Sequence, residues 1–133
     1  MKTTNYEISK QLAEAGFKAK SIFGWHVDGK ECAPSYPLSP TATGYFWSYD
    51  LETILESLPR RIELRKMGKD GVIYELRACF ERSYSEGFKE SNYIGYQNFQ
   101  GFHQELCFMQ QENESLADTA AKMWLKLKKE GLV

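Results

Sequence analysis

Residues 113–131 read NESLADTAAKMWLKLKKEG, the longest stretch of the chain in which periodicity, start signal and stop signal agree. Ser115 or Asn113 can cap the beginning of a helix here, and Gly131 can end it. The apolar residues recur at helical spacing and are Leu116, Ala117, Ala120, Ala121, Trp124 and Leu127. A stripe with alanines for close approach and a tryptophan for contact area predicts that this helix covers a flat apolar surface, such as a β-sheet.

Two shorter helices are expected upstream. Thr4 and Glu7 have the spacing of a capping box, which predicts a helix over residues 5–15 that stops at Gly16. Asp50 can cap a second helix, and the proline at position 59 should end it. The apolar positions of this second helix follow the i, i+3, i+4, i+7 pattern and are Leu51, Ile54, Leu55 and Leu58.

A first hairpin is expected between these two helices. Residues 21–27 lead into Asp28-Gly29, a dipeptide typical of two-residue hairpin turns, and this turn would place Val27 opposite Lys30. The returning strand should be short, because prolines follow it at a spacing of three, which favours an extended polyproline II segment. These are Pro34, Pro37 and Pro40.

Residues 62–68 and 72–82 form a second and clearer hairpin. A loop over residues 69–71 would place Arg65 opposite Glu75, so that opposite charges face each other across the two strands. One face of the hairpin is then predicted to face the core, and its members are Ile62, Leu64, Tyr74, Leu76, Ala78 and Phe80.

The remaining segments complete an antiparallel α+β fold. Residues 83–92 are polar and are expected to form a loop, and residues 93–99 and 106–109 are expected to form two strands joined around Gly101. The order helix, hairpin, helix, hairpin, two strands, helix predicts antiparallel β-hairpins with N-terminal, middle and C-terminal helices packed on them. With 133 residues, of which 42% are apolar, the chain should form a single domain over residues 1–133.

The sequence indicates neither a metal site nor a catalytic site. The side chains of zinc-ligating type are His26, Cys32, His103 and Cys107. His103 and Cys107 would lie about 13 Å apart along one strand, too far to share an ion. Motifs for nucleophiles, phosphate loops and metalloproteases are missing from the sequence, so no catalytic, cofactor-binding or metal-binding residue is predicted.

Aromatic side chains give the best candidates for a binding surface. Residues 84–102 are dense in rings that could belong to the core, anchor a protein interface or stack on bases. A second aromatic group, Tyr45-Phe46-Trp47, follows the proline segment and should either anchor that loop on the core or form part of an exposed patch. The candidate binding residues are Tyr45, Phe46, Trp47, Tyr84, Tyr93 and Tyr96.

Several segments resemble small proteins encoded by phages, prophages and related mobile elements. The segments that carry this resemblance are residues 11–17 (QLAEAGF), 49–59 (YDLETILESLP), Gly95-Tyr96, 114–125 (ESLADTAAKMWL) and 130–132 (EGL). The resemblance covers most of the chain in order, and it implies neither an activity nor particular functional residues.

We therefore expect a non-enzymatic accessory protein that acts by binding a protein partner or by self-association. The alternative is a nucleic-acid-binding protein that uses an aromatic sheet face, together with Arg60, Arg61, Arg65 and Lys66. A net charge of −1 speaks against that alternative. The sequence shows neither a secretory start nor an apolar run of membrane-spanning length, and its three cysteines lack CxxC spacing, so a cytoplasmic location is expected.

Overall fold

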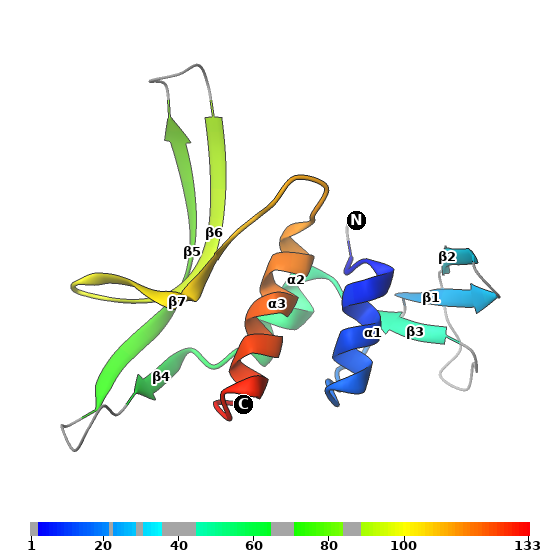
Figure 1. Cartoon of the computed structure of the whole chain (residues 1–133), viewed down its shortest axis with the longest axis horizontal. Coiled ribbons are helices and arrows are strands. Elements are labelled where there is room, and N and C mark those ends of the chain that lie inside the picture. The colour runs from blue at the N-terminus through cyan, green and yellow to red at the C-terminus, as the bar shows by residue number, and fades with distance from the viewer. Residues whose placement is uncertain (1–2, 22, 29–30, 36–44, 65–70, 84–88) are drawn as a thin grey trace.

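The computed structural model describes residues 3–21, 23–28, 31–35, 45–64, 71–83 and 89–133. In these ranges the helices are α1 (Tyr6–Glu14), α2 (Leu51–Ser57) and α3 (Leu116–Lys129). One antiparallel sheet has the order β2-β1-β3 and consists of β1 (Phe23–Asp28), β2 (Glu31–Ser35) and β3 (Tyr45–Ser48). The other has the order β4-β5-β6-β7 and consists of β4 (Arg61–Leu64), β5 (Val72–Ser83), β6 (Lys89–Asn98) and β7 (Gly101–Met109). The α+β prediction is confirmed, and Figure 1 shows the helices lying between the two sheets.

Helix α3 is the centre of the fold. It is capped by Ser115, whose hydroxyl accepts from the backbone N–H of Asp118, and it ends before Gly131, which has a left-handed φ of 73°. The helix contacts α1 and α2 as well as β6 and β7. Trp124 packs edge-on against Phe17, the third residue after α1, with 4.9 Å between the ring centroids. No helix among the described residues is long and apolar enough to cross a membrane.

The start of α1 differs from the predicted capping box. Asn5 caps the helix, because its side-chain oxygen accepts from the backbone N–H of Ile8 over 2.8 Å. The Thr4 hydroxyl is fully buried and instead contacts the Ser9 hydroxyl and accepts from the backbone N–H of Tyr49. The predicted stop is confirmed, since the helix ends before a left-handed glycine at position 16. Residues 3–5 are thereby joined to the segment that precedes α2.

The first hairpin forms with a different register from the predicted one. Val27 lies opposite Cys32 rather than Lys30, and Pro34 lies within β2, opposite Trp25. A proline fits here because β2 is an edge strand, where a missing backbone N–H breaks no interior hydrogen bond. Pro37 and Pro40 lie outside the described residues.

The second hairpin also forms with a shifted register. Glu75 lies opposite Arg61 rather than Arg65, with 3.3 Å between the Arg61 Nη2 and Glu75 Oε1 atoms. Because the shift is an even number of residues, Ile62 and Tyr74 still share a face. The predicted core face ends at Leu76, since Ala78 is exposed.

The later strands are longer than predicted. Strand β5 continues to Ser83 and β6 begins at Lys89, so the predicted loop over residues 83–92 is partly strand. Strands β6 and β7 meet at a tight turn between Asn98 and Gly101, whose φ is +117°. Figure 1 shows the β5–β6 ribbon running well beyond the helices.

Candidate functional site

Tyr96, one of the predicted binding residues, is part of the core. Its side chain is 0% exposed, and its hydroxyl donates to the carbonyl of Pro59 over 2.6 Å. Burial raises the pKa of this phenol. The prediction that Tyr96 belongs to a binding surface is therefore wrong.

The other predicted aromatics that the structure describes lie in two different sheets. Tyr45-Phe46-Trp47 belongs to β3 rather than to a loop, with Phe46 edge-on against Tyr6 at 5.8 Å and Trp47 half-buried against the core. Tyr93 is half-buried in the other sheet. Tyr84 lies outside the described residues, and nothing in the structure describes the side chain of Tyr45. Phe99, at the β6–β7 turn, is 94% exposed.

The structure describes two of the four side chains of zinc-ligating type, His103 and Cys107. Within the described residues, no group of three histidine, cysteine, aspartate or glutamate side chains is placed to hold a metal ion. The His103 ring packs edge-on against Tyr74 at 5.2 Å, and its Nδ1 accepts from the backbone N–H of Glu105. These contacts account for the position of His103 as a structural residue of the sheet.

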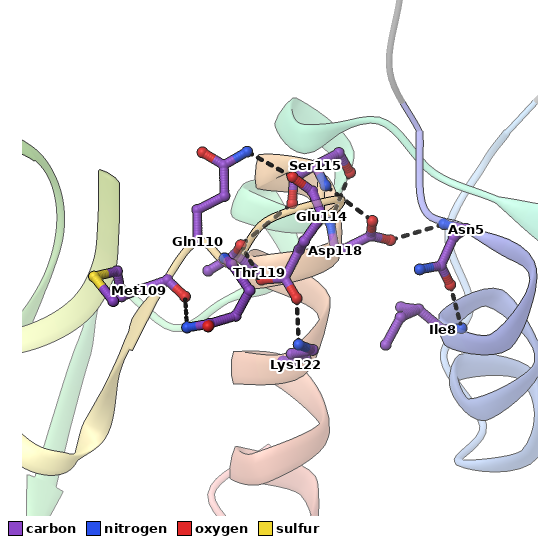
Figure 2. A network of polar contacts seen from close by, with 10 residues as sticks. Asn5, Ile8, Met109, Gln110, Glu114, Ser115, Asp118, Thr119 and Lys122 are labelled. Atoms are coloured by element: carbon purple, nitrogen blue, oxygen red, sulfur yellow. Dashed lines mark hydrogen bonds and ion pairs between the residues drawn. The ribbon is translucent and has the colours of Figure 1, made fainter. Parts of the chain in front are cut away.

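A polar cluster joins the beginnings of α1 and α3 (Figure 2). Asp118 accepts from the backbone N–H of Asn5 over 2.7 Å, and Glu114 accepts from the Thr119 hydroxyl and forms an ion pair with Lys122. Among the described residues, no buried side-chain nitrogen or oxygen lacks a hydrogen-bond partner. Because the buried polar atoms of the cluster have hydrogen-bond partners within the protein, we interpret the cluster as a structural connection between α1 and α3.

Glu114 should make the stability of the folded protein depend on pH. Desolvation alone would raise the pKa of Glu114, but hydrogen bonds from Lys122 and Thr119, the Lys122 charge and the backbone N–H of Gln111 together lower it. A lowered pKa in the folded state stabilises the protein above the ordinary value of 4.5, and this contribution is lost as the pH falls through the folded value. Urea unfolding between pH 6 and pH 3 should therefore show a steeper acid loss in the wild type than in Glu114→Gln. Equal losses in the two proteins would contradict the assignment.

The strongest candidate site is a groove between α2 and β5, which we call the α2–β5 groove. It has a volume of about 450 Å³ and is lined by Leu51, Glu52, Leu55, Glu56, Leu58, Arg60 and Leu76. The half-buried leucines Leu51 and Leu55 face the space from α2, and Leu76 faces it from β5. Its lining therefore combines apolar side chains with charged ones.

The charged side chains at this groove are exposed. Glu52 and Glu56 lie on α2, and Arg60 directly precedes β4. None of the three makes an ion pair with another side chain in the described part of the chain. These charges are available to a ligand, because no described partner has to be displaced.

A second cavity of about 390 Å³ adjoins the first and shares Arg60 and Leu76 with it. Glu75 there pairs with Arg61 at 3.3 Å and with Arg77 at 2.8 Å. Three guanidinium groups, which we call the arginine cluster (Arg60, Arg61 and Arg77), are thus accompanied by one carboxylate. This end of the groove carries a local positive charge in a chain whose net charge is −1.

The backbone beside the arginine cluster is a strand edge. Strand β4 pairs with β5 as far as Glu75, and the backbone N–H of Leu76 still donates to the carbonyl of Arg60 over 2.9 Å. The carbonyl of Leu76 accepts from the guanidinium of Arg77 instead of from a strand. From Arg77 to Ser83, no described strand lies on this side of β5. The groove therefore opens onto strand backbone that pairs with no described strand on this side.

Little in the sequence indicates this groove. The spacing of Leu51 and Leu55 predicts core positions of an amphipathic helix, and Glu52 and Glu56 have the spacing of any solvated helix face. The one available signal was Arg60-Arg61, two consecutive cations directly after a helix-ending proline.

Known proteins offer no template for the site. The resemblance to proteins of phages and mobile elements stays a prediction, because it rests on short segments of the sequence alone. Comparison of the chain with protein-family models, with curated proteins and with solved structures finds no match.

Proposed function

We propose that this chain is a cytoplasmic, non-enzymatic accessory protein of a phage or mobile element, and that it acts by binding a protein partner in the α2–β5 groove. The observation that carries the proposal is the combination in one groove of half-buried leucines with charges and a strand edge that have no partner among the described residues. Covering apolar surface supplies about 25 cal/mol per Å² of favourable free energy, and exposed charges supply orientation.

Binding of nucleic acid is the second candidate, and the arginine cluster favours it. The cluster could contact phosphates, as Arg60 and Arg61 were expected to do, whereas Arg65 and Lys66 lie outside the described residues. The acidic side chains of Glu52 and Glu56, in the same groove, would repel a phosphate backbone. A protein partner agrees better with this mixture of charges.

The proposal is tested by affinity capture from a lysate of the host, with and without nuclease. We expect the wild type to retain a protein in stoichiometric amount after nuclease, and Leu55→Asp to lose it by about tenfold or more, since a central apolar contact is replaced by a charge. Phe99→Ser is the matched control, because it removes an exposed aromatic side chain far from the groove in sequence and should leave capture unchanged.

Melting temperatures of both variants must accompany this experiment, because Leu55 also packs against the core. If a folded Leu55→Asp variant retains the partner, the groove is not the binding site. Loss of capture in Phe99→Ser would transfer the site to the aromatic segment. Loss of every protein after nuclease, with strong weakening by salt, would favour nucleic acid.

A further inference from the structure

We propose that the partner binds through an extended segment that adds a strand to the open edge of β5, with an apolar side chain in the α2–β5 groove and a neighbouring carboxylate on the arginine cluster. This inference rests on the proposed function, since it specifies how a protein partner would occupy the same groove.

The backbone of β5 is suited to receive such a strand. In an antiparallel ladder, alternate residues present their N–H and C=O groups to the same edge. Leu76 presents its N–H to β4, so Ala78 and Phe80 present theirs to the continuation of that edge. Ala78, the first of these two residues, is exposed. Unpaired strand edges of this kind recruit extended peptides through main-chain hydrogen bonds.

The chain itself is held away from this edge. After Arg60, the next residue of the same parity is Leu58, whose N–H donates to the carbonyl of Leu55 at the end of α2 instead of to β5. The carbonyl of Pro59 accepts from the hydroxyl of Tyr96, a buried side chain. The segment that links α2 to β4 therefore leaves the plane of the sheet at Pro59. In Figure 1, β5 continues beyond β4 and away from the helices. The space between α2 and β5 is the α2–β5 groove.

Charge decides which extended segment fits best. The arginine cluster places three cations beside the start of the open edge, and Glu75 already contacts two of them, Arg61 and Arg77. Arg60 has no ion pair within the described residues. A carboxylate of the partner would meet Arg60 at close range, whereas a phosphate backbone would bring further negative charges towards Glu52 and Glu56.

The leucines define the second requirement. Leu51 and Leu55 on α2 and Leu76 on β5 line the groove together, next to Arg60. In an extended segment, residues two apart face the same side, so an apolar side chain and a carboxylate at alternate positions can reach the leucines and Arg60 together. The motif that the groove selects is therefore an aliphatic or aromatic residue two positions from Asp or Glu.

A selection experiment tests the motif. The immobilised full chain is offered a ribosome-displayed library of short random segments, and the enriched sequences are synthesised as peptides. We expect enrichment of the apolar-acidic motif, and a loss of affinity of about tenfold when the peptide carboxylate is changed to the amide. Arg60→Glu should weaken binding at least as much, whereas Lys128→Glu, an exposed charge reversal on α3, should not change it.

A backbone experiment tests the strand addition. Two versions of a selected peptide are N-methylated, one at the odd positions and one at the even positions. Methylation of the N–H groups that face β5 should abolish binding, whereas methylation of the other set should leave it nearly intact. Hydrogen exchange of the Ala78 and Phe80 amides should slow in the presence of the unmodified peptide. Equal effects of both methylation patterns, or unchanged exchange at these amides, would overturn the proposal.

The outcomes separate this inference from the proposed function. If Leu55-dependent capture of a protein succeeds but the selected peptides show no charge preference, or no peptide is selected, strand addition is wrong and the groove remains a protein-binding site. If capture is absent and no peptide is selected, both proposals fail. Displacement of a selected peptide by single-stranded oligothymidylate, with direct binding of that probe to the wild type but not to Arg60→Glu, would overturn the peptide assignment in favour of nucleic acid.

Discussion

Replacing Trp124 with alanine is expected to lower the free energy of unfolding by about 3 to 5 kcal/mol. The side chain is 8% exposed, and its ring meets Phe17 edge-on at 4.9 Å. Phe17 in turn meets Tyr49 at 4.7 Å, so the three rings connect α3, the end of α1 and the segment before α2. Alanine would leave a cavity where the Trp124 ring packs against Phe17. The surrounding backbone can close this cavity only in part.

Urea unfolding followed by circular dichroism measures this loss. Lys128→Ala is the control, because Lys128 is exposed on the same helix and alanine is a better helix former. Its effect should stay within about 0.5 kcal/mol. An unchanged unfolding midpoint in Trp124→Ala would show that the ring contributes nothing to the core.

Replacing Asp118 with alanine is expected to cost about 3 kcal/mol, although the residue lies in the first turn of a helix. The carboxylate is 3% exposed and accepts from the backbone N–H groups of Asn5 and Ser115, over 2.7 and 3.0 Å. Alanine would leave both donors without this acceptor. The capping box of α3 and the attachment of α1 would be lost together.

Asp118→Asn separates the two contributions. The amide keeps one oxygen, so one of the two N–H groups can retain an acceptor, and the loss should be roughly half that of the alanine variant. Thermal unfolding at neutral pH compares the three proteins. If the asparagine variant is as unstable as the alanine variant, charge rather than acceptor number determines the contribution of Asp118.

The sequence was sufficient to predict the elements that depend on local pattern. Helix α3 and its stop at Gly131 followed from periodicity and capping chemistry, and so did the Asp50 cap of α2. The cap of α1 did not, because Thr4 is drawn into a buried hydrogen bond with Tyr49, 45 residues away. A distant partner of this kind leaves no mark in the local spacing of residues.

Strand registers were harder to predict for a related reason. Opposite charges predicted Arg65 opposite Glu75, yet Arg61 is an equally good partner and is the residue that lies there. An even shift keeps every side chain on its face, so the apolar pattern does not distinguish the two registers. The density of aromatic residues led to the wrong prediction that Tyr96 belongs to a binding surface. Its hydroxyl donates to the carbonyl of Pro59, which is 37 residues away and which no local pattern indicates. The α2–β5 groove is lined by residues of α2 and β5 together with Arg60, so it depends on tertiary packing that no local pattern encodes.

The attachment of residues 3–5 has a consequence for the order in which the protein can fold during synthesis. Asn5 binds Asp118, which lies 113 residues later in the chain. While the ribosome is still making the sheets, the beginning of the chain has already emerged but lacks its partner on α3. The last contacts of α1 must wait for the last helix, so a nascent chain stalled before α3 should display α1 unattached, as a target for chaperones and proteases.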